Sequence, residues 1–98
     1  MPKLTPIRRR RIRRILNWLR DNYDVDLPDL PEGRTCHPFE CPVARAFSTK
    51  YPGSCVGSDT YTVVRPGEQL EKLPPFVRAF TYEFDNGLWP EYEEDANA

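Results

Sequence analysis

The sequence predicts a small α+β domain in which three helices pack on a two- to three-stranded antiparallel sheet, in the order α-α-β-β-(β)-α. Three observations predict this fold class. Apolar residues recur at helical spacing near the start of the chain, a segment rich in β-branched residues follows its midpoint, and proline marks the start of each expected helix. The 98 residues suffice for one modest core, so we expect residues 1–98 to form a single domain.

The first helix is expected from Pro6 to Tyr23. Thr5 offers a hydroxyl N-cap, and Pro6 occupies the first helical position, which proline favours. One face of this helix is apolar, formed by Ile12, Ile15, Leu16, Leu19 and Tyr23. The stripe predicts that this face packs on the rest of the fold and that most of the arginines between its members stay in solvent.

A loop and a second helix are expected next. Residues 24–40 hold three prolines and one glycine without a sustained period, which is typical of a loop. Pro42 then opens a helix with Cys41 as its N-cap, and Pro52-Gly53 is expected to stop it. Its apolar face would comprise Val43, Ala46, Phe47 and Tyr51.

The expected sheet starts from Thr60–Arg65, where β-branched residues predominate. Residues 54–56 can form its hairpin partner across Gly57-Ser58-Asp59, and Gln69–Leu73 can add a short third strand. Pro74-Pro75 then begins a third helix, which Asn86-Gly87 ends as a left-handed cap. The apolar face of this helix would comprise Phe76, Val77, Phe80 and Phe84.

The two chain ends are expected to differ from the domain between them. Leu88-Trp89-Pro90 should fold back onto the core because it is apolar. Residues 1–5 and 91–98 are expected to be frayed, since the last segment is acidic and has little to bury.

Charge is strongly polarised along the chain. Residues 1–20 carry eight positive charges and no acid, whereas residues 21–98 carry six basic and fifteen acidic residues, a balance of −9. From Glu83 onward there are six acids and no base. Exposed charge pairs are worth only ~0–1 kcal/mol each, so no stable charge-driven oligomer is expected.

The candidate partner- or phosphate-binding residues are the arginines of the first helix, namely Arg8, Arg9, Arg10, Arg11, Arg13 and Arg14. Arginine near a helix N-terminus opposes the helix dipole, at a cost of about 0.3–1 kcal/mol for each exposed charge. The run therefore indicates a solvated face, a nucleic-acid site, a surface for an acidic protein or, least favoured, a contact with an anionic membrane. Clustered guanidinium groups suit phosphate, but the remaining charge of −9 would repel nucleic acid.

The three cysteines, Cys36, Cys41 and Cys55, are expected to be free thiols. Their odd number, in a chain without an apparent export signal, favours a reducing compartment. A zinc site that also uses His37 is disfavoured by the ligand spacing, so no metal is expected. Cys41 could act as a helix-capping nucleophile with His37 nearby, but the stretch offers no third, orienting group.

Several function classes are excluded or disfavoured by what the sequence lacks. It has no apolar run long enough to span a bilayer, and no phosphate-binding loop, nucleophile elbow or HExxH-type motif. We therefore expect a cytoplasmic protein that is not an enzyme and binds no cofactor.

Short motifs give a resemblance to a known group. Cys41-Pro42-Val43-Ala44 is followed by the Thr60–Val64 segment, by Leu73-Pro74-Pro75-Phe76-Val77 with Phe80, and by Trp89-Pro90. Over roughly residues 36–90, this pattern resembles small accessory proteins of actinobacterial phages, which are mostly without assigned activity. The resemblance implies a phage-encoded protein in a bacterial host cytoplasm and assigns no site residues; the arginine-rich helix lies outside it.

The sequence thus predicts a non-enzymatic interaction protein that binds a bacterial host protein, with the arginine face and the acidic end as candidate contacts. The alternative is an RNA- or DNA-binding protein that uses the same arginines.

Overall fold

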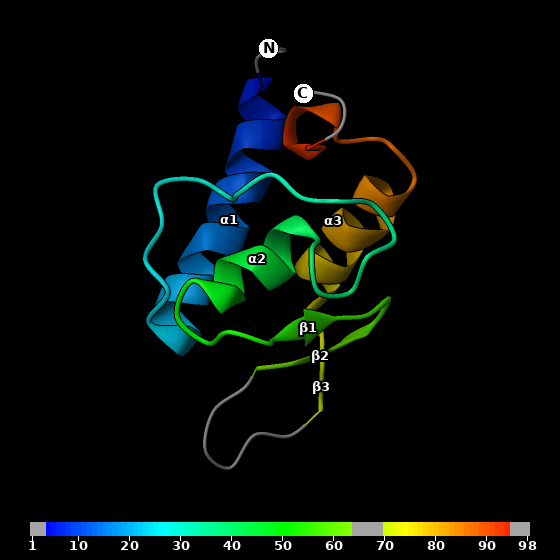
Figure 1. The fold of residues 1–98 in the computed structure, drawn as a ribbon. Coiled ribbons are helices and arrows are strands. Elements are labelled where there is room, and N and C mark those ends of the chain that lie inside the picture. The colour runs from blue at the N-terminus through cyan, green and yellow to red at the C-terminus, as the bar shows by residue number, and fades with distance from the viewer. Residues whose placement is uncertain (1–3, 64–69, 95–98) are drawn as a thin grey trace.

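The computed structural model describes residues 4–63 and 70–94 and confirms the predicted α+β fold. Figure 1 shows the three helices gathered on one side of a small three-stranded sheet. In chain order the elements are α1 (Pro6–Tyr23), α2 (Pro42–Ser48), β1 (Cys55–Val56), β2 (Thr60–Thr62), β3 (Glu71–Lys72), α3 (Pro75–Asp85) and the 3₁₀ helix η1 (Pro90–Tyr92).

Helix α1 has the predicted bounds. The Thr5 side chain accepts a hydrogen bond from the backbone N–H of Arg8 at 3.3 Å, which satisfies one of the orphan donors at the helix start. Asp24 ends the helix in the left-handed conformation, with φ of 56°. Four members of the predicted stripe are buried, whereas Leu16 is only half-buried.

Helix α2 begins as predicted and ends earlier. The Cys41 sulfur accepts a hydrogen bond from the backbone N–H of Ala44 at 3.4 Å. The helix ends at Ser48 rather than at Pro52-Gly53. The Thr49 hydroxyl donates to the Ala46 carbonyl at 2.7 Å, and the Lys50 N–H bonds the Phe47 carbonyl at 3.1 Å. This 3₁₀-type turn ends the regular helix, and the Tyr51 N–H also bonds the Phe47 carbonyl at 2.7 Å.

The sheet is antiparallel with strand order β1-β2-β3. Strand β2 pairs with β1 through Val56↔Tyr61 and with β3 through Tyr61↔Glu71. The predicted hairpin and the predicted third strand are therefore confirmed. Strand β2 ends at Thr62, short of the predicted Arg65; positions 64–69 lie outside the described residues.

Helix α3 ends in a Schellman motif. Gly87 has φ of +78°, a left-handed conformation that glycine adopts without a steric penalty. Its N–H bonds the Phe84 carbonyl at 3.0 Å, and the Leu88 N–H bonds the Glu83 carbonyl at 2.9 Å. The predicted left-handed cap is confirmed, and it turns the chain so that Trp89 enters the core, where it is fully buried.

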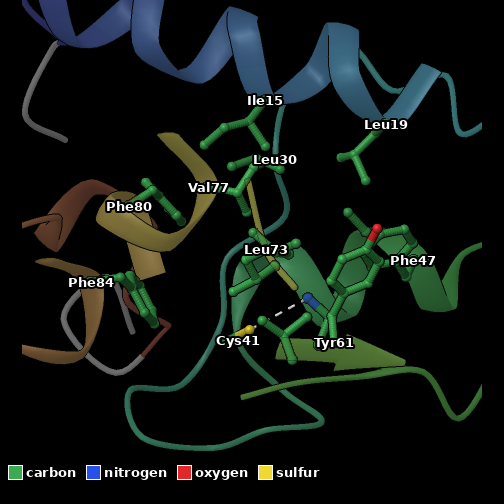
Figure 2. Packing of buried hydrophobic residues seen from close by; sticks show 14 of the residues in the cluster. Ile15, Leu19, Leu30, Cys41, Phe47, Tyr61, Leu73, Val77, Phe80 and Phe84 are labelled. Carbon is green, nitrogen blue, oxygen red and sulfur yellow. Dashed lines mark hydrogen bonds between the residues drawn. The ribbon is translucent and has the colours of Figure 1, made fainter. Parts of the chain in front are cut away.

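The core lies where the three helices meet the sheet (Figure 2). Phe47 of α2 stacks on Tyr61 of β2, with ring centroids 5.6 Å apart. Phe80 of α3 packs against Trp89, with centroids 5.0 Å apart. Ile15 and Leu19 of α1 close the core from above in Figure 2.

The expectation of a frayed acidic end is wrong for residues 91–94. Tyr92 is 4% exposed, and its hydroxyl donates to Asp29 at 2.8 Å. The Gly33 N–H bonds the Tyr92 carbonyl at 2.8 Å, and the Glu94 N–H bonds the Gly33 carbonyl at 2.9 Å. Burial of one aromatic ring and these backbone bonds hold the segment down despite its charge. Residues 95–98 lie outside the described part of the chain.

The start of the chain is likewise more ordered than expected. Leu4 packs against the core and Thr5 caps α1, so the expected fraying does not apply to these two residues. Residues 1–3 lie outside the described residues.

Candidate functional site

The six candidate arginines of α1 divide into an inner and an outer set. A helix has 3.6 residues per turn, so consecutive side chains point about 100° apart around its axis. The run therefore cannot lie on a single face. Arg8, Arg11 and Arg14 turn toward other parts of the fold, whereas Arg9, Arg10 and Arg13 point to solvent.

Arg8 binds the C-terminal segment. Its Nη2 donates to Glu91 Oε1 at 2.8 Å and to the Leu88 carbonyl at 2.7 Å. Its guanidinium carbon lies 3.8 Å from the centroid of a Trp89 ring, a cation–π arrangement. Arg8 therefore ties the first helix to the last segment of the described chain.

Arg11 and Arg14 contact helix α3. Arg11 Nη1 lies 2.9 Å from Glu83 Oε1, and that same oxygen accepts a hydrogen bond from the Trp89 indole N–H at 2.9 Å. The hydrogen bond from Arg11 lowers the pKa of Glu83 below its usual value. The Arg14 guanidinium lies 4.2 Å from the Phe76 ring centroid. These two arginines are used in packing the fold.

The outer arginines have no such contacts. Arg9, Arg10 and Arg13 are exposed, and none forms an ion pair with any acid in the described part of the chain. Together with Pro6, Arg14 and Asn17 they line a shallow surface depression of about 420 Å³. We call Arg9, Arg10 and Arg13 the outer arginine face. It is the candidate binding site.

The acids of the C-terminal half act mainly inside the molecule. Glu83 and Glu91 neutralise the inner arginines, and Glu94 pairs with Arg34 and Arg45, each at 3.2 Å. The predicted role of the acidic end as a partner contact is thus reduced, because these carboxylates already have partners. The opposite charges at the two ends of the chain suggested that they could pair within the molecule, but did not indicate which arginine meets which acid.

Two of the three cysteines line a second, smaller pocket. Cys36, Cys41 and Asp85 border a hollow of about 190 Å³ between the loop before α2 and helix α3. The Cys36 N–H donates to Asp85 Oδ1 at 2.8 Å. All three cysteines are free thiols. No group of three histidine, cysteine or acidic side chains suited to a metal occurs among residues 4–63 and 70–94.

Cys41 is unsuited to act as a nucleophile. Burial raises its pKa to about 11, which opposes formation of the reactive thiolate near neutral pH. Its sulfur is engaged as the α2 cap, and the only histidine, His37, is directed to Glu40 at 3.2 Å. In Figure 2 Cys41 lies within the packed core.

Comparison with known proteins gives no assignment. Neither a family model, nor a curated protein, nor a solved structure matches the chain. Of the helices described, none is long and apolar enough to cross a membrane.

Proposed function

We propose that this protein is a non-enzymatic interaction module that binds an acidic surface of a bacterial protein through its outer arginine face. The proposal rests on the division of the six α1 arginines into an inner and an outer set. Three arginines are held by Glu83, Glu91 and aromatic rings, whereas Arg9, Arg10 and Arg13 have no acid partner among the described residues.

The helix dipole supports a role outside the fold for two of these residues, Arg9 and Arg10. An exposed cation near a helix N-terminus costs about 0.3–1 kcal/mol, and Arg9 and Arg10 lie in the first two turns of α1. The inner arginines offset this cost through ion pairs and ring contacts. For the outer arginines, carboxylates on a partner would offset it, because guanidinium forms charge-assisted, two-pronged hydrogen bonds with them.

The non-enzymatic part of the proposal is supported by the state of the reactive groups. Cys41 has a raised pKa of about 11, and the described residues hold no triad-like arrangement around it. The setting of the proposal comes from the resemblance of residues 36–90 to actinobacterial phage proteins: the cytoplasm of an infected bacterium.

Nucleic-acid binding is the competing function, since phosphate also suits clustered guanidinium groups. The remaining charge distribution disfavours it. Residues 21–98 carry a balance of −9, and a long polyanion on α1 would approach those charges as well.

The test compares two double charge reversals of equal size. Arg10→Glu with Arg13→Glu changes the outer arginine face. Lys72→Glu with Arg78→Glu changes exposed cations on β3 and α3 by the same amount. Both are used as bait in nuclease-treated actinobacterial lysate, followed by mass spectrometry. We expect the first variant to lose the protein partners of the wild type and the second to keep them.

Two results would contradict the proposal. Equal capture by both variants would mean that the outer arginine face is not the binding site. Tight binding of mixed RNA or DNA, with affinity falling steeply with salt, would favour the competing function; the expected log–log slope is about −0.9 per neutralised phosphate on duplex DNA.

A further inference from the structure

A groove runs beside the outer arginine face, between α1 and the loop that follows it. In Figure 1 this loop turns back along α1 and then crosses the helix. Two depressions of about 430 and 390 Å³ lie between them and share Arg13, Leu16 and Pro28 as lining residues. Because they share these walls, the two depressions lie side by side along α1, and we call them together the groove.

Three leucines line the groove beside polar residues: Leu4 in the first depression, Leu27 in the second and Leu16 in both. Each is half-buried and packs against the core, and together they form the leucine floor. The sequence pattern placed Leu16 in the buried stripe of α1, but the structure leaves it partly open. Three neighbouring leucines that are incompletely covered provide a surface on which apolar side chains of a ligand gain from burial.

The two rims carry opposite charge. Arg9, Arg13 and Arg20 line the side formed by α1, and Asp26 and Asp29 line the side formed by the loop. Arg20 forms an ion pair with Asp21 at 3.2 Å. Arg9 and Arg13 are therefore the rim cations that have no acid partner among the described residues. Asp29 accepts from the Tyr92 hydroxyl and the Leu30 N–H, both at 2.8 Å, which fixes that rim.

We infer that this groove binds an extended, acidic segment of the partner protein in which acidic and apolar residues alternate. The inference rests on the proposed function and names the form of the ligand. Side chains of an extended chain alternate between two faces. Leucine-like side chains would then meet the leucine floor, while carboxylates on the other face point out of the groove, where the exposed side chains of Arg9 and Arg13 can bind them.

The spacing of the rim arginines fits such a ligand. Residues i and i+2 of an extended chain lie about 6.6 Å apart, and positions four apart on a helix are about 6 Å apart along its axis. Arg9 and Arg13 are therefore in register with two successive carboxylates on one face. From Arg9 to Arg20 the rim spans about 16 Å along α1, enough for about five extended residues.

Charge and shape favour a peptide over nucleic acid in the groove. A nucleic-acid strand carries a negative charge on every nucleotide and would face Asp26 and Asp29 across the groove. A peptide can present its carboxylates to one rim only. The leucine floor also offers no donors for phosphate, whereas it suits aliphatic side chains.

The experiment measures binding of three fluorescent probes to the full chain by anisotropy. The first is a seven-residue peptide that alternates aspartate with leucine. The second alternates aspartate with serine and has the same charge. The third is a single-stranded oligonucleotide of the same charge. We expect the leucine peptide to bind at least tenfold more tightly than the other two.

Two variants connect this difference to the groove. Leu27→Asn makes the floor polar and should reduce the preference for the leucine peptide to less than threefold. Arg13→Glu should weaken binding of both peptides at least tenfold, while Arg78→Glu, the matched reversal on α3, should change neither by more than twofold. Circular dichroism melting checks that each variant is folded.

Failure of the inference and failure of the proposed function would look different. Equal binding of the two peptides, or a preference that survives Leu27→Asn, would overturn the groove and leave the outer arginine face as a charge-only site. No binding of either peptide would overturn the groove as well. If in addition the lysate partners survive Arg10→Glu with Arg13→Glu, the proposed function itself would be wrong.

Discussion

The Arg8 guanidinium lies over a Trp89 ring, with its carbon 3.8 Å from the ring centroid. The same group donates to Glu91 and to the Leu88 carbonyl. One arginine of the basic run therefore closes the fold by joining its first helix to its last described turn. Arg8 is therefore a structural arginine, whereas the outer arginine face is left for a partner. We make four predictions about the fold and its reactive groups.

Arg8 should be more important for stability than its exposed neighbour Arg10. Arg8→Ala removes a cation–π contact and charge-assisted hydrogen bonds, so we expect a loss of about 1–2 kcal/mol in the free energy of unfolding. Arg10→Ala, the matched control, should change it by less than ~0.5 kcal/mol. Urea denaturation followed by tryptophan fluorescence measures both. Equal losses for the two variants would mean that the contact with Trp89 is not stabilising.

The segment around Tyr92 should be required for folding. Tyr92→Ala removes a buried ring and its bond to Asp29, and we expect a cost of roughly 3–5 kcal/mol, as for other large aromatic residues. Tyr82→Ala is the control, because Tyr82 is 69% exposed, and it should melt close to the wild type. A wild-type melting temperature for Tyr92→Ala would restore the original expectation of a frayed end.

Acid should weaken the fold partly through Glu83. Its pKa is lowered from the usual value of 4.5 because Arg11 donates a hydrogen bond to the carboxylate. Ionised Glu83 therefore stabilises the folded state at pH values above about 4.5, and this contribution is lost as pH falls through the lowered folded pKa.

Glu83→Gln tests that sign, because the amide keeps an acceptor for Trp89 and removes the charge. The difference in unfolding free energy between wild type and Glu83→Gln should be larger at pH 7 than at pH 3. In an Arg11→Met background the difference at pH 7 should shrink. A difference that does not depend on pH would show that the charge of Glu83 is not what stabilises the fold.

The thiol of Cys41 should resist modification. Its pKa is raised to about 11 by burial, so at pH 7.5 almost none of it is thiolate. In a Cys36→Ser, Cys55→Ser chain, maleimide labelling should be slow in buffer and fast in denaturant. A matched chain that keeps only Cys36, which is exposed, should label rapidly in both. Fast labelling of native Cys41 would argue for an accessible, activated thiol.

Local structure was largely predictable. Each helix start and end depends on a few neighbouring residues, as at the caps of Thr5 and Cys41, the proline starts and the Schellman end at Gly87. The interactions that form them lie within that short stretch of sequence. The same holds for the strand pairing across a short turn. The early end of α2, where the N–H groups of Thr49 and Lys50 bond carbonyls three residues back, was not predicted, because the expected stop relied on Pro52-Gly53.

The sequence predicted which segment holds the candidate site, but not which of its arginines are exposed. The sequence by itself determined that α1 carries an uncompensated cluster of arginines, since charge count and helical period can be read from the chain. Only the tertiary structure decided which of them are available. Glu83 and Glu91 reach Arg11 and Arg8 from the other end of the chain, and the loop after α1 leaves Leu16 partly open beside Arg13. Such contacts depend on where distant segments are brought together in space, and no local pattern of residues contains that information.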